Sequence, residues 1–116
     1  MPERLLSALY RVAESALQRG DAARGQQLLV EIVARFPADP AANAARFELA
    51  LILEKTGRLE DALAMTDEIV RGRSKGPFVE PARLLRCRLA KASLASHPGT
   101  ASASRAGQIM VDCAAK

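Results

Sequence analysis

The chain has 116 residues, which is enough for one domain built around a single core. Apolar residues make up 49% of it, but three Phe, one Tyr and no Trp leave the core to small and aliphatic side chains. No stretch of about 18 apolar residues occurs, so we expect no membrane-spanning helix. No segment alternates polar and apolar residues with the period of a β-strand, so we expect an all-α fold of about six helices.

The net charge of +4 is divided unevenly along the chain. Residues 1–70 carry 8 basic and 11 acidic side chains, a net charge of −3, whereas residues 71–116 carry 9 basic and 2 acidic ones, a net charge of +7. We therefore expect an acidic partner to be attracted to the C-terminal part.

Glycine and proline divide the first 37 residues into two expected helices. The first begins at Pro2, since proline is preorganised for the first helical position, and Gly20 ends it. Asp21 caps the second helix, and Pro37 prevents its continuation past Phe36. Two apolar stripes are expected to face inward. In the first helix the stripe is Leu5, Leu9, Val12, Ala13 and Ala16, widened by Leu6 and Leu17, and in the second it is Gly25, Leu28, Leu29, Ile32, Val33 and Phe36.

The next two expected helices repeat this arrangement. Asp39 and Pro40 begin the third helix, which runs to about Lys55. It is apolar on more than one face, so we expect it to be the most buried helix. Gly57 ends it, and the fourth helix spans residues 59–71.

The C-terminal third is less regular. Residues 72–79 form a linker, since two glycines, a proline and several cations cannot form a buried element. A fifth helix begins at Glu80 and Pro81 and ends at residues 97–99, His-Pro-Gly. A sixth begins at Thr100, with its large apolar residues confined to its second half.

The two cysteines, Cys87 and Cys113, fall in separate expected helices and lack metal-ligand spacing. We expect them to be buried reduced thiols, since free cysteine behaves as a small hydrophobe. A disulfide would require an oxidising compartment, for which the sequence offers no support.

A shift of 37 residues places the first helix pair on the second. Gly20 falls on Gly57 at the turn between helices, and small residues recur where the helices of a pair must touch. The other matched pairs are Tyr10 with Phe47, Val12 with Leu49, Ala13 with Ala50, Ala16 with Leu53, Gly25 with Ala62, Ile32 with Ile69 and Val33 with Val70. The alternative is an ordinary helical bundle whose Ala-rich helices resemble each other by composition. Composition alone would rarely place a glycine turn and small residues at one common offset.

This pattern resembles the tetratricopeptide repeat (TPR) of bacterial type, a helix–turn–helix unit of about 34 residues. The residues at the positions of the family's pattern are Leu9, Val12, Ala13, Ala16, Gly25, Leu29 and Pro37 in the first copy and Arg46, Leu49, Ala50, Leu53, Ala62, Thr66 and Ser74 in the second. The second copy departs from the pattern, since Arg46 and Thr66 are polar and Ser74 replaces the terminal proline, and the family's Trp and Tyr are absent. The period is longer by about three residues, nearly one helical turn, so the inward face is kept.

The resemblance implies a right-handed α-solenoid of antiparallel helix hairpins in one domain, residues 1–116. Repeat 1 would cover about residues 3–37, repeat 2 about 40–72, and a partial third repeat with a terminal helix 80–116. It also implies a non-enzymatic adaptor that binds a peptide or helix of another protein, an acidic one included, in a groove lined by the first helix of each repeat. The expected groove residues are Tyr10, Arg11, Glu14, Gln18, Phe47, Glu48, Leu51, Lys55, Arg83 and Arg86.

Aromatic and arginine side chains are the usual anchors of an interface, although Tyr10 and Phe47 could equally fill gaps between helices. Some family members clamp a C-terminal carboxylate with Lys and Asn. Tyr10 and Glu14 stand at those positions here, so we expect no such clamp.

Two other functions stay open. The module could self-associate through its last helix, where Ile109, Met110 and Val111 lie together, since the array lacks a polar terminal cap. It could also bind nucleic acid through residues 71–91, which hold seven cations and one acid. This second alternative ranks lower, because only Phe78 offers a stacking surface there and charge runs are usually solvated.

We expect no enzyme, no catalytic residue, no metal and no cofactor. The lone His97 precedes a proline at a helix end, and there is no glycine-rich phosphate loop and no metal-ligand spacing. The first residues, Met1–Leu6, contain an acid and no continuous apolar stretch, so they are not a signal peptide. If residue 1 is the native start, we expect a cytoplasmic location.

Overall fold

The computed structural model describes residues 2–72, 76–96, 99 and 101–114. All regular structure in these residues is helical, as predicted. The six helices are α1 (Pro2–Gln18), α2 (Ala22–Arg35), α3 (Ala42–Lys55), α4 (Leu59–Arg71), α5 (Val79–Ser96) and α6 (Ala101–Ala114). The predicted stop at His97 and Pro98 and the centre of the predicted linker, residues 73–75, lie outside the described residues.

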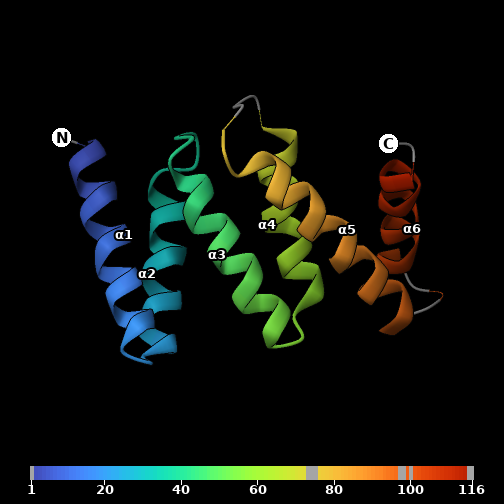
Figure 1. The fold of residues 1–116 in the computed structure, drawn as a ribbon, viewed down its shortest axis with the longest axis horizontal. Helices are drawn as coiled ribbons and strands as arrows, with labels where there is room; N and C mark the ends of the chain where they lie inside the picture. Colours follow the sequence, from blue (N-terminus) through green and yellow to red (C-terminus); the bar gives the residue numbers. More distant parts are fainter. Residues whose placement is uncertain (1, 73–75, 97–98, 100, 115–116) are drawn as a thin grey trace.

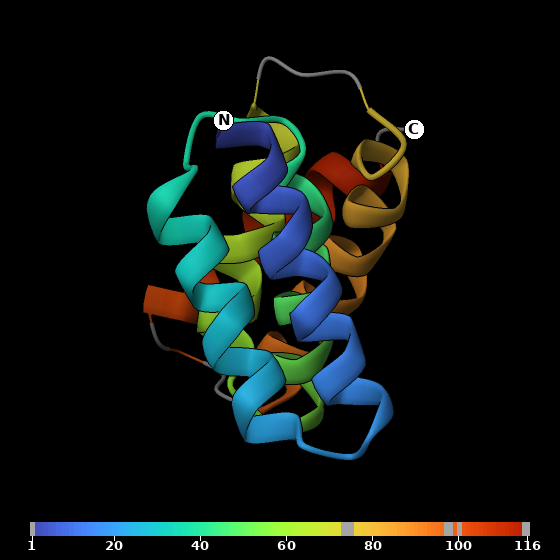
Figure 2. The ribbon, with the colours of Figure 1, turned by 90° about the vertical axis from the view of Figure 1, so that its left-hand side faces the viewer.

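The helices follow one another along the longest axis of the molecule, which measures 44 × 30 × 19 Å. Each helix packs mainly against the helix before it and the helix after it in the chain. The first and last helices, α1 and α6, consequently lie at opposite ends (Figure 1). Seen from the α1 end, α1 and α5 lie towards one side of the molecule and α2 lies towards the other (Figure 2).

The turns after α1 and α3 have the same backbone geometry. Gly20 and Gly57 adopt φ angles of +86° and +80°, the left-handed conformation that favours glycine. At both turns the glycine N–H donates to the carbonyl three residues earlier, and the next residue donates to the carbonyl five residues earlier: Asp21 to Ala16 and Arg58 to Leu53, each at 2.9 Å. The match at an offset of 37 residues therefore extends from the sequence to the hydrogen bonds of the helix ends.

Small residues allow α1 and α2 to pack closely. A Cβ on Gly25 of α2 would lie 2.6 Å from Cγ of Leu17 and 3.3 Å from the carbonyl oxygen of Ala13. Ala13 and Ala16 are completely buried in the same interface. The expected role of small residues at helix contacts is confirmed here.

The inward face of α1 differs from the predicted stripe. Leu5 and Val12 are 43% and 48% exposed, while Leu6 is buried with Ala13 and Ala16. Because α1 is the terminal helix and packs mainly on α2, only a narrow stripe of it is covered. The prediction that Leu5 and Val12 face the core was wrong for this reason.

The helix α3 begins later than predicted, at Ala42, and two of its buried side chains are polar, Asn43 and Arg46. The carboxylate of Asp39 accepts a hydrogen bond from the N–H of Ala41 at 2.9 Å, so Asp39 stabilises a turn before the helix rather than capping it. Arg46 is only 5% exposed and donates to Asn43 at 2.7 Å and to the carbonyl of Pro37. This arginine fastens α3 to the loop that follows α2, a role that the sequence did not predict.

The two cysteines form a disulfide that joins α5 to α6. The Cα atoms of Cys87 and Cys113 lie 6.2 Å apart, although 26 residues separate them in the chain. The prediction of two reduced thiols was wrong, because the packing of α6 on α5 brings these residues together. Sequence spacing carries no information about that contact.

Candidate functional site

The structure brings three of the predicted groove residues, from α1 and α3, into one polar cluster. Tyr10 and Glu14 are one turn apart on α1, and Glu48 lies on α3. Burial, the charge of Glu48 and a hydrogen bond with Glu14 together raise the pKa of Tyr10 to about 12. Burial, with the charge of Glu14, also raises the pKa of Glu48 above its usual value.

Electrostatic repulsion therefore acts within this cluster. Among the described residues, neither Glu14 nor Glu48 forms an ion pair with a cation. The half-buried carboxylate of Glu48 lies close to the exposed carboxylate of Glu14, and a surface of this kind favours a cation. The cluster can hold a basic side chain from another molecule.

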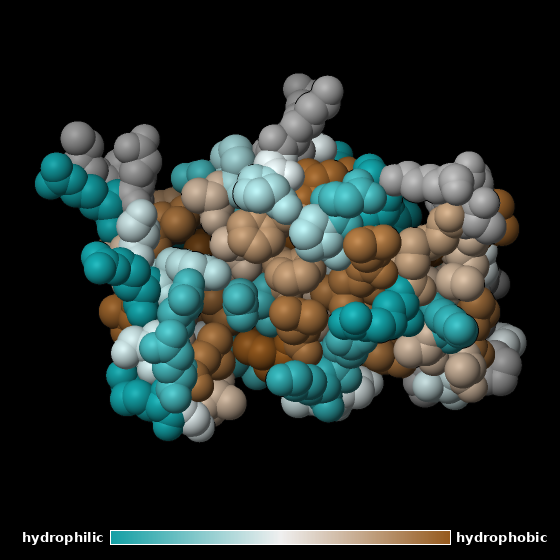
Figure 3. Space-filling view, in the orientation of Figure 1, coloured by the Kyte–Doolittle hydropathy of each residue, from teal (hydrophilic) through white to brown (hydrophobic). Residues whose placement is uncertain are grey.

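Apolar side chains continue this surface along α3 and towards α5. The rings of Phe47 and Phe78 lie 5.8 Å apart at an interplanar angle of 47°, an arrangement that aromatic pairs prefer. Phe78 comes directly before α5, so the pair connects two helices across the surface. Both rings are half-buried, as is Leu51 on α3. Apolar surface is visible between polar side chains over the middle of the side of the molecule that Figure 3 shows.

The remaining predicted residues of α1 and α3 are spread more widely. Gln18 and Lys55 are exposed near the C-terminal ends of their helices. Arg11 is exposed and lies beside Arg4, Ser7 and Ala8 along a shallow depression on α1. We use the name first-helix face for the part that the structure brings together, which consists of Tyr10, Glu14, Phe47, Glu48, Leu51 and Phe78.

Two arginines of α5, the predicted groove residue Arg83 and the neighbouring Arg88, are paired with carboxylates. Arg83 contacts Glu80 at 2.7 Å. Arg88 binds Glu54 through two hydrogen bonds of 2.7 Å, a bidentate pair between α5 and α3. These contacts neutralise part of the positive charge that the sequence predicted for residues 71–91.

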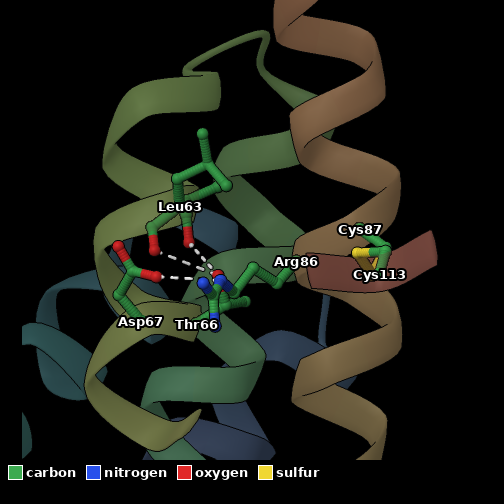
Figure 4. A network of polar contacts seen from close by, with 7 residues as sticks. Leu63, Thr66, Asp67, Arg86, Cys87 and Cys113 are labelled. Atoms are coloured by element: carbon green, nitrogen blue, oxygen red, sulfur yellow. Dashed lines mark hydrogen bonds and ion pairs between the residues drawn. A yellow bond between two sulfur atoms is a disulfide. The ribbon is translucent and has the colours of Figure 1, made fainter. Parts of the chain in front are cut away.

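Arg86 is directed into the molecule rather than towards a groove. Its Nε lies 3.0 Å from Oδ1 of Asp67, and the two side chains are only 12% and 16% exposed. Beside them, the hydroxyl of Thr66 donates to the carbonyl oxygen of Leu63 at 3.0 Å, within α4 (Figure 4). Asp67 and Arg86 thus form a polar link between α4 and α5. The sequence did not indicate that Asp67 takes part in packing between helices.

The described residues contain no group of three or more His, Cys, Asp or Glu that could hold a metal ion. Within the same residues, no helix has the length and apolar character needed to cross a bilayer. Comparison of the chain with protein-family models, with curated proteins and with solved structures finds no match in any of the three.

Proposed function

We propose that this chain is a TPR-like α-solenoid that acts as an adaptor, binding a peptide or helix of a partner protein on the first-helix face. The identical turns at Gly20 and Gly57 support the repeat, since the same hydrogen bonds recur 37 residues apart. The packing of each helix on its chain neighbours is also what a repeat array requires. On this proposal the protein presents a surface and performs no catalysis.

The observation that carries the binding proposal is the cluster of Tyr10, Glu14 and Glu48. The charge of Glu14 disfavours the ionised form of the half-buried Glu48, and no cation is paired with either carboxylate among the described residues. A lysine or arginine of a bound segment would relieve that repulsion. The apolar side chains of the same segment would then contact Phe47 and Leu51.

The charge pairs on α5 alter the expected partner. Arg83, Arg86 and Arg88 are each bound to a carboxylate. Their positive charges therefore attract an acidic segment less strongly than three arginines without carboxylates would. We therefore propose a segment with at least one basic and several apolar residues. For the same reason we do not carry the nucleic-acid alternative further.

A comparative pull-down tests the adaptor proposal. Wild type, the Tyr10→Ala/Phe47→Ala double variant and a Val30→Ala control would each be immobilised and exposed to lysate of the source organism. Val30 is 51% exposed on α2, so its truncation leaves the first-helix face intact. The proposal expects a protein retained by wild type and control but lost from the double variant, whose helix content must match wild type by circular dichroism. Equal retention by all three would contradict it.

Self-association is the second candidate, favoured by apolar exposure at both ends of the molecule. Leu5 and Val12 are exposed on α1, and Val111 is 62% exposed on α6. The predicted patch on α6 is smaller than expected, because Ile109 is only 3% exposed. Light scattering over a hundredfold range of protein concentration tests self-association. A monomer mass at every concentration eliminates it. A mass that rises with concentration in wild type, but stays that of the monomer in Val12→Glu, supports it.

A further inference from the structure

The Cys87–Cys113 disulfide lies in the wall of a cavity between α5 and α6. The cavity has a volume of about 280 Å³, near the lower end of the roughly 300–1,000 Å³ typical of small-molecule sites. Leu84 and Ile109 form apolar parts of its wall, together with both cysteines. The cysteines are half-buried rather than sealed in the core. A small molecule in this cavity therefore lies against the disulfide.

We propose that this cavity is a site of thiol–disulfide exchange, in which a low-molecular-weight thiol reduces the Cys87–Cys113 bond and releases α6 from α5. The proposal is independent of partner binding on the first-helix face. It assigns a chemical purpose to a disulfide that the adaptor proposal leaves unused.

The chemistry requires two equivalents of the thiol. A thiolate attacks one cysteine sulfur, the protein S–S bond breaks, and the other cysteine leaves as a thiolate that takes a proton from water. A second thiolate then attacks the mixed disulfide, which yields the second protein thiol and the oxidised small-molecule disulfide. Two electrons pass from the small thiols to the protein.

Two guanidinium groups lie beside the disulfide in this cavity. Arg83 and Arg86 border it, each in contact with a carboxylate, Glu80 and Asp67 respectively. Positive charge near a cysteine favours the thiolate form, both for the incoming group and for the cysteine that leaves. Asp67 and Glu80 moderate this effect through their contacts with the two arginines.

The disulfide joins α6 covalently to α5. This terminal helix packs mainly on α5. Among its residues whose side chains are described, 105–111 and 113, only Ala106 and Ile109 are buried. The described side chains of α6 therefore contribute one large core residue, Ile109, together with Ala106 and the partly buried Met110 and Cys113. Reduction should therefore loosen α6 and uncover the surface of α5 beneath it, while α1–α4 stay folded.

The test uses the oxidised full chain under native conditions with glutathione as the probe. Thiol release is followed by alkylation and intact mass, and the mixed disulfide is identified in the same spectra. Hydrogen exchange is then compared between oxidised and reduced protein, with peptides of α1 as the internal reference. We expect reduction without denaturant and faster exchange in α6, by roughly tenfold or more, with α1 unchanged. A disulfide that resists glutathione until the chain is unfolded would overturn the proposal, and so would exchange in α6 that is the same in both states.

A pair of variants tests whether the thiol enters through the cavity. Leu84 is 67% exposed on the cavity wall, and Val30 is a comparably exposed apolar residue of α2. Leu84→Glu adds a negative charge at the site, which should slow reduction by anionic glutathione roughly two- to fivefold. Val30→Glu adds the same charge elsewhere and should leave the rate unchanged. Equal rates in the two variants would show that reduction does not proceed through this cavity.

Discussion

Asp67 of α4 and Arg86 of α5 form an ion pair of 3.0 Å in which both side chains are largely buried. The pair lies beside the buried hydroxyl of Thr66 and one residue from the disulfide cysteine Cys87 (Figure 4). The link between the fourth and fifth helices is consequently polar as well as apolar. Replacing Asp67 by a neutral residue would remove the carboxylate that the Arg86 guanidinium contacts in this poorly solvated position.

Asp67→Asn should therefore destabilise the fold substantially. Replacing one member of a largely buried ion pair costs about 3 kcal/mol, so we expect a loss of about that size in the free energy of unfolding. Glu31→Gln is the matched control, because Glu31 contacts Arg35 at 3.2 Å with side chains 40% and 52% exposed. An exposed pair of this kind contributes less than about 1 kcal/mol. Urea unfolding measures both variants, and equal losses would contradict the importance of burial.

The ionisation of Tyr10 offers a spectroscopic test of the carboxylate cluster. Tyr10 is the chain's single tyrosine and there is no tryptophan, so ultraviolet absorbance reports it alone. Its pKa in the folded chain is about 12, against 10.0 for an ordinary tyrosine. Near pH ~11 a urea-unfolded sample should be mostly ionised and the folded chain mostly neutral. Glu14→Gln removes the negative charge of Glu14 while keeping an oxygen that can accept a hydrogen bond, and should move the pKa of Tyr10 down towards 10.0. An unchanged titration in that variant would show that the cluster does not exist.

The same shift has a consequence for stability. Because the folded state holds the Tyr10 proton more tightly than the unfolded state, the unfolded chain loses its proton first as the pH rises. The contribution of this group to stability is complete below pH 10.0 and declines as the pH rises from there towards about 12. Urea midpoints measured on either side of pH ~10 should fall more steeply with pH in wild type than in Tyr10→Phe. Parallel pH profiles would contradict the raised pKa.

Replacing a glycine by alanine is expected to lower the stability of the chain in α2 and to raise it in α6. Gly25→Ala places a methyl group within 2.6 Å of Leu17 and 3.3 Å of a carbonyl oxygen of α1, so we expect a net loss of about 1 kcal/mol from overpacking. A methyl group at Gly107 would meet nothing within 4 Å. Gly107→Ala should therefore stabilise the chain by up to about 1 kcal/mol through helix propensity. Thermal unfolding distinguishes the two, and a stabilising Gly25→Ala would show that α1 and α2 pack less closely than described.

The sequence predicted the helices well because their ends depend on local chemistry. Gly20 and Gly57 need a left-handed conformation, and Asp21 accepts a hydrogen bond from the N–H of Arg24, as an N-cap should. Such signals act over a few residues and can be read from the chain directly. The start of α3 was less accurate, since Asp39 could cap either a turn or a helix.

Features that depend on contacts between distant residues could not be predicted in the same way. The burial of Arg46 depends on the carbonyl of Pro37, and the disulfide depends on the packing of α6 against α5. Neither contact leaves a periodic signal in the sequence. Of the candidate site, spacing along one helix placed Tyr10 beside Glu14, but the approach of Glu48 from α3 required the structure.

Chemical-shift mapping by NMR tests partner binding on the first-helix face most directly. A peptide that binds the chain would be selected from a displayed random library and titrated into labelled wild type and into the Glu14→Gln/Glu48→Gln variant. Partner binding on this face predicts selected peptides with a basic residue, shift changes concentrated at Tyr10, Phe47, Glu48 and Leu51, and affinity at least about tenfold weaker in the variant. Shift changes confined to α2, α4 or α6, with equal affinity for both proteins, would contradict it.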